Sequence, residues 1–385
     1  MVLRENFSPS FYLKSLASGV LSISFFIYLM FLVPHENSPI ITFWDILEVL
    51  KKGDYITFIT TFSLVFVIAF AVIHYKLLLL NSKEFLIYRK TESYKNLFAT
   101  NKQVLLIVIP LTFTTSILLT FILAVILIPS FWSIVQYIFP LVFVGFAING
   151  IYTLKIFFNY FARILLTGEF NFGKKDQLLQ IITIFAFSMT AVGFASLGAM
   201  STNITLSSIG VFASLFFATL ASVLTILKFT FGFRNIKKGM NIESALSLSF
   251  IIPILTLLGI TFIRITFGLE HNFDKETNSI AIFILGSIIL TLQIIFGIFS
   301  SILVKKLGTL EKFINENIKS ALSFILIFPA IAFFIFGMFF INIGIVNNEI
   351  VEKYSTSYFV LMIPFVLAQF KAIISFFKLK KRFDS

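Results

Sequence analysis

The sequence contains no cysteine, only three histidines, and charged residues at 12% of its 385 positions. The absence of cysteine excludes disulfides, thiol redox chemistry and cysteine-metal sites, and three histidines leave little for a metal site of another kind. A soluble domain of this length would carry about twice this share of charge to cover its surface. The composition therefore argues against a soluble globular protein.

Apolar residues fill 58% of the chain, and apolar runs of about twenty residues, long enough to cross a bilayer as a helix, recur along it. The first run, "SLASGVLSISFFIYLMFLV", is longer than the apolar part of a signal peptide and has no small-residue cleavage site after it. We interpret it as a spanning helix. The sequence predicts an all-α polytopic membrane protein, one transmembrane domain over 1–385. The predicted spans are 11–33, 55–80, 103–128, 130–165, 178–201, 204–231, 243–267, 277–304, 318–345 and 355–380.

Lysine and arginine are unequally distributed between the two ends of these spans. They concentrate before the first span, in the loops after even-numbered spans and in the C-terminal "KLKKR". The opposite ends hold only Lys51, Lys52, Lys275 and Lys353, with Arg264 close by. The positive-inside rule therefore predicts that both termini are cytoplasmic. The net charge of +12 is then a topology signal and an attraction to anionic membrane lipid, which requires no nucleic-acid partner.

This topology groups the spans into five hairpins, in which an odd-numbered helix crosses the membrane and an even-numbered helix returns. The hairpins cover approximately 11–80, 103–165, 178–231, 243–304 and 318–380. Two of them begin with nearly the same phrase, "NIESALSLSFIIP" at 241–253 and "NIKSALSFILIFP" at 317–329. The seventh and ninth helices therefore have the same register relative to the membrane.

Helix-breaking residues fall inside most of the odd-numbered spans, at Pro110, Pro253 and Pro329, with Gly193 in the middle of the fifth. A proline removes one N–H and crowds the carbonyl four residues earlier, so we expect kinks at these positions. In hydrocarbon, a freed carbonyl must face protein or a water-filled cavity. We therefore predict that bent odd-numbered helices form an inner ring around a central pore. The alternative is that small residues and kinks only help the helices to pack.

Hydroxyl side chains near these breakers are candidates for the pore lining. Ser244 and Ser247 are one helical turn apart and share a helix face, as do Ser320 and Ser323. A hydroxyl can donate to an anion but carries no charge, so hydroxyls suit passage better than tight binding.

Other residues extend this candidate pathway. The fifth helix carries Phe187 and Ser188 in a related Ala-Phe-Ser unit. Arg264, near the outer end of the seventh helix, and Lys155, towards the inner end of the fourth, could attract anions electrostatically. The alternative for Lys155 is that it snorkels to the cytoplasmic interface.

Ten spans in five hairpins, cytoplasmic termini and kinked odd-numbered helices resemble the TehA family. This family joins bacterial tellurite-resistance and dicarboxylate-type transport proteins to plant guard-cell slow anion channels. At the residue level the resemblance rests on "ALSF" (Ala321 to Phe324), "IVIP" (Ile107 to Pro110) and "FIIP" (Phe250 to Pro253). It implies a pore closed by a phenylalanine of the ninth helix, at the place that Phe324 occupies. It also implies a homotrimer with one pore per subunit in the bacterial cytoplasmic membrane.

The leading functional hypothesis is the passage of small inorganic or organic anions through a neutral, hydroxyl-lined pore gated by Phe324, without a cofactor. One alternative is a proton- or sodium-coupled transporter of a small oxyanion or carboxylate. Such proteins usually bury acids or histidines, and no aspartate or glutamate lies well inside a predicted span. The other alternative is a non-transporting membrane subunit. An enzyme is not expected, because the sequence has no metal-ligand cluster, no nucleophile with a base and no paired intramembrane carboxylates.

Overall fold

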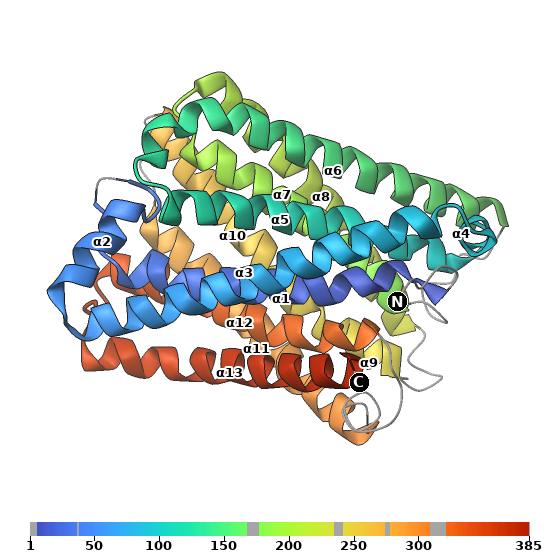
Figure 1. The fold of residues 1–385 in the computed structure, drawn as a ribbon. Coiled ribbons are helices and arrows are strands. Elements are labelled where there is room, and N and C mark those ends of the chain that lie inside the picture. Colours follow the sequence, from blue (N-terminus) through green and yellow to red (C-terminus); the bar gives the residue numbers. More distant parts are fainter. Residues whose placement is uncertain are drawn as a thin grey trace.

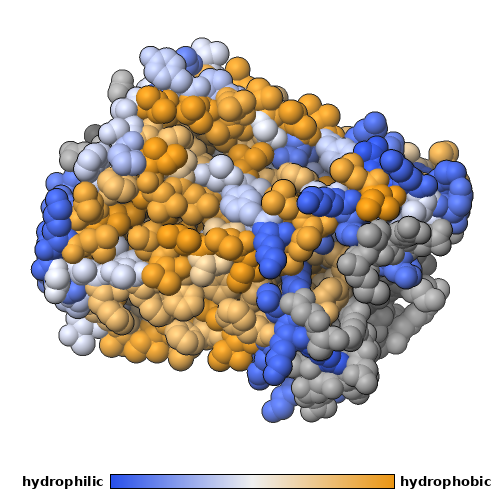
Figure 2. Space-filling view, in the orientation of Figure 1, coloured by the Kyte–Doolittle hydropathy of each residue, from blue (hydrophilic) through white to orange (hydrophobic). Residues whose placement is uncertain are grey.

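The protein is described by a computed structural model, which covers residues 6–36, 38–167, 177–234, 242–273, 278–308 and 321–384. The elements within these ranges are helices, and ten helical segments are long and apolar enough to cross a membrane. Figure 1 shows the long helices lying side by side, and Figure 2 shows an apolar band between two polar ends. The prediction of an all-α polytopic membrane protein with ten spans is confirmed.

The ten spans are built from single helices or from short helices joined end to end. The second span extends to Tyr88 instead of ending near residue 80. In chain order the elements are η2 Pro9–Phe11, α1 Tyr12–Leu32, α2 Phe43–Lys52, α3 Tyr55–Tyr88, α4 Glu92–Leu97, η3 Asn101–Ile107, α5 Val108–Leu127, α6 Phe131–Thr167, α7 Gln177–Met200, α8 Ile204–Arg234, α9 Ile242–Ser249, α10 Ile251–Phe273, α11 Ser279–Lys306, η6 Ala321–Ile327, α12 Phe328–Phe339, η7 Phe340–Ile345, η8 Val346–Asn348 and α13 Thr356–Asp384.

The odd-numbered spans lie inside the molecule and the even-numbered spans outside it. Over its most apolar stretch, each odd-numbered span is between 72% and 94% buried, whereas each even-numbered span is between 17% and 28% buried. Among the buried spans, α1 contacts α5, α5 contacts α7, α7 contacts α10, α10 contacts α12, and α12 contacts α1. The outer helices α3, α6, α8, α11 and α13 each pack on the preceding buried span. Their exposed apolar side chains suit contact with lipid, which is itself apolar.

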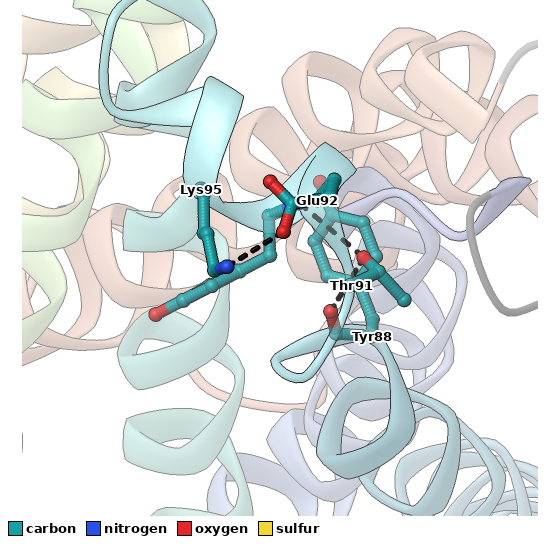
Figure 3. Close-up of polar contacts among 5 residues, drawn as sticks. Tyr88, Thr91, Glu92 and Lys95 are labelled. Atoms are coloured by element: carbon teal, nitrogen blue, oxygen red, sulfur yellow. Dashed lines mark hydrogen bonds and ion pairs between the residues drawn. The ribbon is translucent and has the colours of Figure 1, made fainter.

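The two ends of the molecule differ in what they carry. Both termini and α4 lie at one end, here named the terminal end, and α2 lies at the other, here named the α2 end (Figure 1). At the terminal end, Thr91 caps α4: its Oγ1 accepts from the Tyr94 N–H at 3.4 Å and donates to the Tyr88 carbonyl at 2.8 Å. Lys95 Nζ lies 2.6 Å from Glu92 Oε1 (Figure 3). The cap stabilises the start of α4 at the chain reversal between the second and third spans, and the exposed ion pair adds little to it.

The three prolines that were predicted to bend buried spans stand where a helix begins. The 3-10 helices η3 and η6 precede α5 and α12, in which Pro110 is the third residue and Pro329 the second. Similarly, α9 ends at Ser249 and α10 begins at Ile251, two residues before Pro253. A proline in the first turn costs no intrahelical hydrogen bond, since that N–H has no partner there anyway. Each kink that was predicted at a proline is therefore a change of helix at the start of an α-helix.

Gly193 serves packing rather than interruption. Helix α7 runs unbroken through it. A Cβ at this position would lie 2.8 Å from Cε1 of Phe146 in α6, so only glycine admits the ring this close to the helix backbone.

Candidate functional site

A cavity of about 150 Å³ lies among the buried spans, and α1, α5, α7, α10 and α12 all contribute to its wall. We name it the central cavity. Its described wall is apolar except for Ser196, Thr256 and Arg264. The apolar side chains of the wall are Val20, Ile23, Phe26, Ile27, Leu118, Ile122, Phe185, Met189, Val192, Pro253, Leu257, Ile260, Phe328, Ala332, Ile335 and Phe339.

The two hydroxyls of the wall already donate their protons to carbonyls. Ser196 Oγ donates to the Val192 carbonyl of its own helix at 2.9 Å. Thr256 Oγ1 donates to the Ala332 carbonyl of α12 at 3.0 Å, and it accepts from Gln293 Nε2 at 2.8 Å. Because each hydroxyl has one proton, neither is left to donate to a molecule in the cavity.

Arg264 is the charged group of the wall, and the described residues leave it without a counter-charge. Its Nε is buried without a hydrogen-bond partner, and no described carboxylate forms an ion pair with it. Its guanidinium carbon lies 5.8 Å from the centroid of the Phe339 ring, a cation–π contact. Arg264 is half-buried, and removing even part of a guanidinium from water without a partner is costly in a low-dielectric interior. The arrangement is therefore suited to an anion as the missing partner.

A second cavity, of about 500 Å³, lies at the α2 end, and Arg264 and Phe339 also line it. We name it the vestibule. Its wall is more polar and includes Gln136, Thr202 and His271. Gln136 of α6 binds the end of α7 and the turn that follows it. Its Nε2 donates to the Met200 carbonyl at 3.3 Å, and its Oε1 accepts from the Thr202 N–H at 3.1 Å. Arg264 and Phe339 thus stand between a roomy vestibule and a small apolar cavity.

Three phenylalanine rings lie at the terminal end of the central cavity, and we name them the phenylalanine triad. Phe185 comes from α7, Phe250 from the junction of α9 and α10, and Phe328 from the start of α12. The ring centroids are 5.6 Å apart for Phe185–Phe250 and Phe185–Phe328, and 6.0 Å apart for Phe250–Phe328. All three side chains are buried. The triad joins three of the buried spans, and two of its rings, Phe185 and Phe328, form part of the cavity wall.

The residue predicted as the gate lies elsewhere. The Phe324 ring is fully buried against α13, with centroids 5.8 Å from Phe376 and 6.3 Å from Phe383. It is not among the described residues that line the central cavity. The ring of the ninth span that borders the cavity belongs to Phe328. The only local signal for it is its place before Pro329, which Ile252 shares before Pro253.

The serines that were predicted to line the pore do not line the central cavity, as far as the structure describes them. Ser188 Oγ donates to the Ile184 carbonyl of its own helix at 3.0 Å. Ser247 and Ser323 are buried but do not border the cavity. Ser320 and the side chain of Ser244 lie outside the described part of the chain.

Two further predicted site residues, Phe187 and Lys155, lie away from the central cavity. Phe187 packs outwards, with its ring centroid 5.4 Å from that of Phe157 in α6 and 6.0 Å from that of Phe217 in α8. Lys155 is exposed on the outer helix α6. Among the predicted binding and lining residues whose side chains the structure describes, only Arg264 borders the central cavity.

No family model, no curated protein and no solved structure matches the chain. The fold defines a polytopic α-helical membrane protein, and its function has to be argued from the central cavity, Arg264 and the vestibule.

Proposed function

We propose that the protein passes small anions across the membrane between its buried spans, with Arg264 as the anion-binding residue. The observation that carries the proposal is the position of Arg264: the guanidinium borders both cavities and has no counter-charge among the described residues. A transient anion supplies the missing charge. Because the next chamber is apolar and offers no donor, it does not bind the anion, and entry into it costs the anion part of its hydration free energy.

The contacts among the buried spans support an inner ring of odd-numbered helices, since the sequence of contacts from α1 through α5, α7, α10 and α12 returns to α1. Each outer helix completes a hairpin with the buried span before it. With the termini in the cytoplasm, as the charge distribution predicts, the vestibule opens to the outside and the phenylalanine triad closes the cytoplasmic side. The homotrimer and the bacterial cytoplasmic membrane are proposed on the TehA resemblance alone.

This pathway differs from a neutral, hydroxyl-lined pore. Its wall is apolar and its hydroxyls donate to carbonyls, so the Arg264 guanidinium is the group that selects among anions. An anion must therefore exchange part of its water shell for Arg264 before it enters the cavity. Because stripping a strongly hydrated or multiply charged anion costs more free energy, monovalent and weakly hydrated anions are favoured.

Proton coupling is a second candidate because of His74 in α3. Its side chain is fully buried, with Nε2 2.8 Å from Ser116 Oγ and Nδ1 2.8 Å from the Ser15 carbonyl. It ties α3 to α1 and α5 inside the molecule. His74 does not line the central cavity, so anion passage without coupling is the better supported function.

The test is anion flux into liposomes that contain the purified protein, with chloride, nitrate and acetate, with and without a pH gradient. Arg264→Gln should lower flux about 10- to 100-fold, since a hydrogen bond to a charged group contributes about 1.5–3 kcal/mol. Lys155→Gln, the same change on the outside of the molecule, is the matched control and should leave flux unchanged. Equal flux through wild type and Arg264→Gln would contradict the proposal, and flux that requires the pH gradient would favour coupling.

A further inference from the structure

We infer that the preferred ligand is a small monocarboxylate with an apolar body, such as an arylcarboxylate or a short branched acid. The inference rests on the proposed anion site at Arg264 and names its ligand class. Its basis is the juxtaposition of one guanidinium with an apolar chamber of about 150 Å³ directly beside it.

The size of the chamber sets the size of the apolar body. Cavities of about 150 Å³ lined by leucine, isoleucine and phenylalanine stay dry and accept benzene. The central cavity has this volume, and its wall is built from the same kinds of side chain. A carboxylate on Arg264 would therefore place a phenyl ring or a branched alkyl group into space that water does not fill favourably.

The polarity of the chamber argues against the other anion classes. Chloride or nitrate can reach Arg264, but neither carries an apolar body to fill the cavity. A dicarboxylate meets a different difficulty, because its second carboxylate finds no cation and no free donor among the described residues of the chamber. If that carboxylate stays in the vestibule, the chamber is left empty.

Aromatic rings at two places in the wall of the central cavity favour a planar aromatic ligand in particular. Phe339 lies beside the guanidinium, at 5.8 Å from its carbon to the ring centroid, and also packs edge-on against Phe31 with centroids 5.0 Å apart. Phe185 and Phe328 face the far side of the same chamber. An aromatic body would thus meet aromatic rings at both ends, where edge-to-face contacts add to the apolar burial.

The experiment is equilibrium binding of radiolabelled benzoate to the purified full-length protein in detergent, with unlabelled competitors. Acetate has the carboxylate but no aromatic ring, and benzamide has the ring but no charge. Succinate has a second carboxylate. Benzoate should displace the label at least about tenfold better than each of these, since every tenfold corresponds to about 1.4 kcal/mol.

Variants separate the two halves of the site. Arg264→Gln should weaken benzoate binding about 10- to 100-fold. Ala332→Leu, and independently Val192→Phe, fill the chamber and should weaken benzoate while leaving acetate unchanged. Ala281→Leu, at an exposed position of α11, is the matched control, and size-exclusion profiles establish that each variant is folded.

The outcomes test the ligand class independently of the proposal that the protein passes anions. Equal competition by acetate and benzoate, or benzoate binding that neither filling variant weakens, would overturn the ligand class. Absence of benzoate binding together with chloride flux that depends on Arg264 would do the same and leave the proposed function standing. Benzoate binding that needs both Arg264 and the open chamber would establish the ligand class, even if no flux of any anion were found.

Discussion

Two phenylalanines of the ninth span, four positions apart, are expected to differ in their effect on closure of the anion pathway. Phe328 borders the central cavity and belongs to the phenylalanine triad, whereas Phe324 points towards α13. If the triad closes the pathway, Phe328→Ala should raise anion flux through liposomes and Phe324→Ala should not. Both rings are buried and each packs against two other rings, so the pair is matched in burial and aromatic contacts but differs in its position relative to the cavity.

The magnitude follows from the ring contacts. Phe328 has centroids 5.6 Å from Phe185 and 6.0 Å from Phe250, and each such aromatic pair contributes about 0.5–1.5 kcal/mol. Removing the ring therefore withdraws about 1–3 kcal/mol from the closed arrangement, which corresponds to an increase of about 5- to 150-fold in the open population. Phe324→Ala should cost as much global stability, about 3–5 kcal/mol for a buried phenylalanine, without this increase.

The assay compares initial rates of chloride and benzoate entry for wild type and both variants at equal protein incorporation. Thermal unfolding of each variant in detergent shows whether the two lose similar stability. A rise in flux for Phe324→Ala with no rise for Phe328→Ala would refute the assignment of closure to the triad and return the gate to Phe324. No rise for either variant would refute a phenylalanine gate in this span.

Two further predictions concern the stability of the framework around the cavity. Gly19→Ala should lower the free energy of unfolding by about 2–5 kcal/mol, because its Cβ would lie 2.6 Å from Nδ1 of His74, which cannot shift without breaking buried hydrogen bonds. Gly297→Ala, whose Cβ would meet its nearest neighbour at 3.5 Å, should be neutral or slightly stabilising, and chemical unfolding in detergent distinguishes the two. Tyr358→Phe removes the 2.8 Å hydrogen bond to Asn342 Oδ1 in the π-helix η7 and should cost about 1–3 kcal/mol in the same assay; an unchanged unfolding midpoint would contradict the importance of that bond.

The sequence by itself determined the membrane class and the number of spans. Span length and apolarity are properties of the local chain, so they can be read without knowledge of which helices meet. The prolines at 110, 253 and 329 were predicted as kinks, and the structure shows that they lie at the starts of α5, α10 and α12. The single arginine of the seventh span was also visible as a candidate from its chemistry.

Only the tertiary structure decided which side chains face the cavity. The residues at 321–327 form a 3-10 helix, which turns faster per residue than an α-helix. The direction of Phe324 therefore cannot be deduced from α-helical spacing. The serines illustrate a second reason: a hydroxyl in a helix can bond a carbonyl one turn earlier, as Ser188 does, and residue type alone does not say whether its proton is free.

Arg264 shows both contributions at one residue. Its charge near the outer end of a span is a fact of the sequence. Among the described residues it has no counter-charge, and its place between the vestibule and the central cavity depends on buried spans that are far apart in the chain. Because the electrostatic cost of partly burying a guanidinium depends on the groups around it, only the packed structure identified Arg264 as the strongest candidate for the binding site.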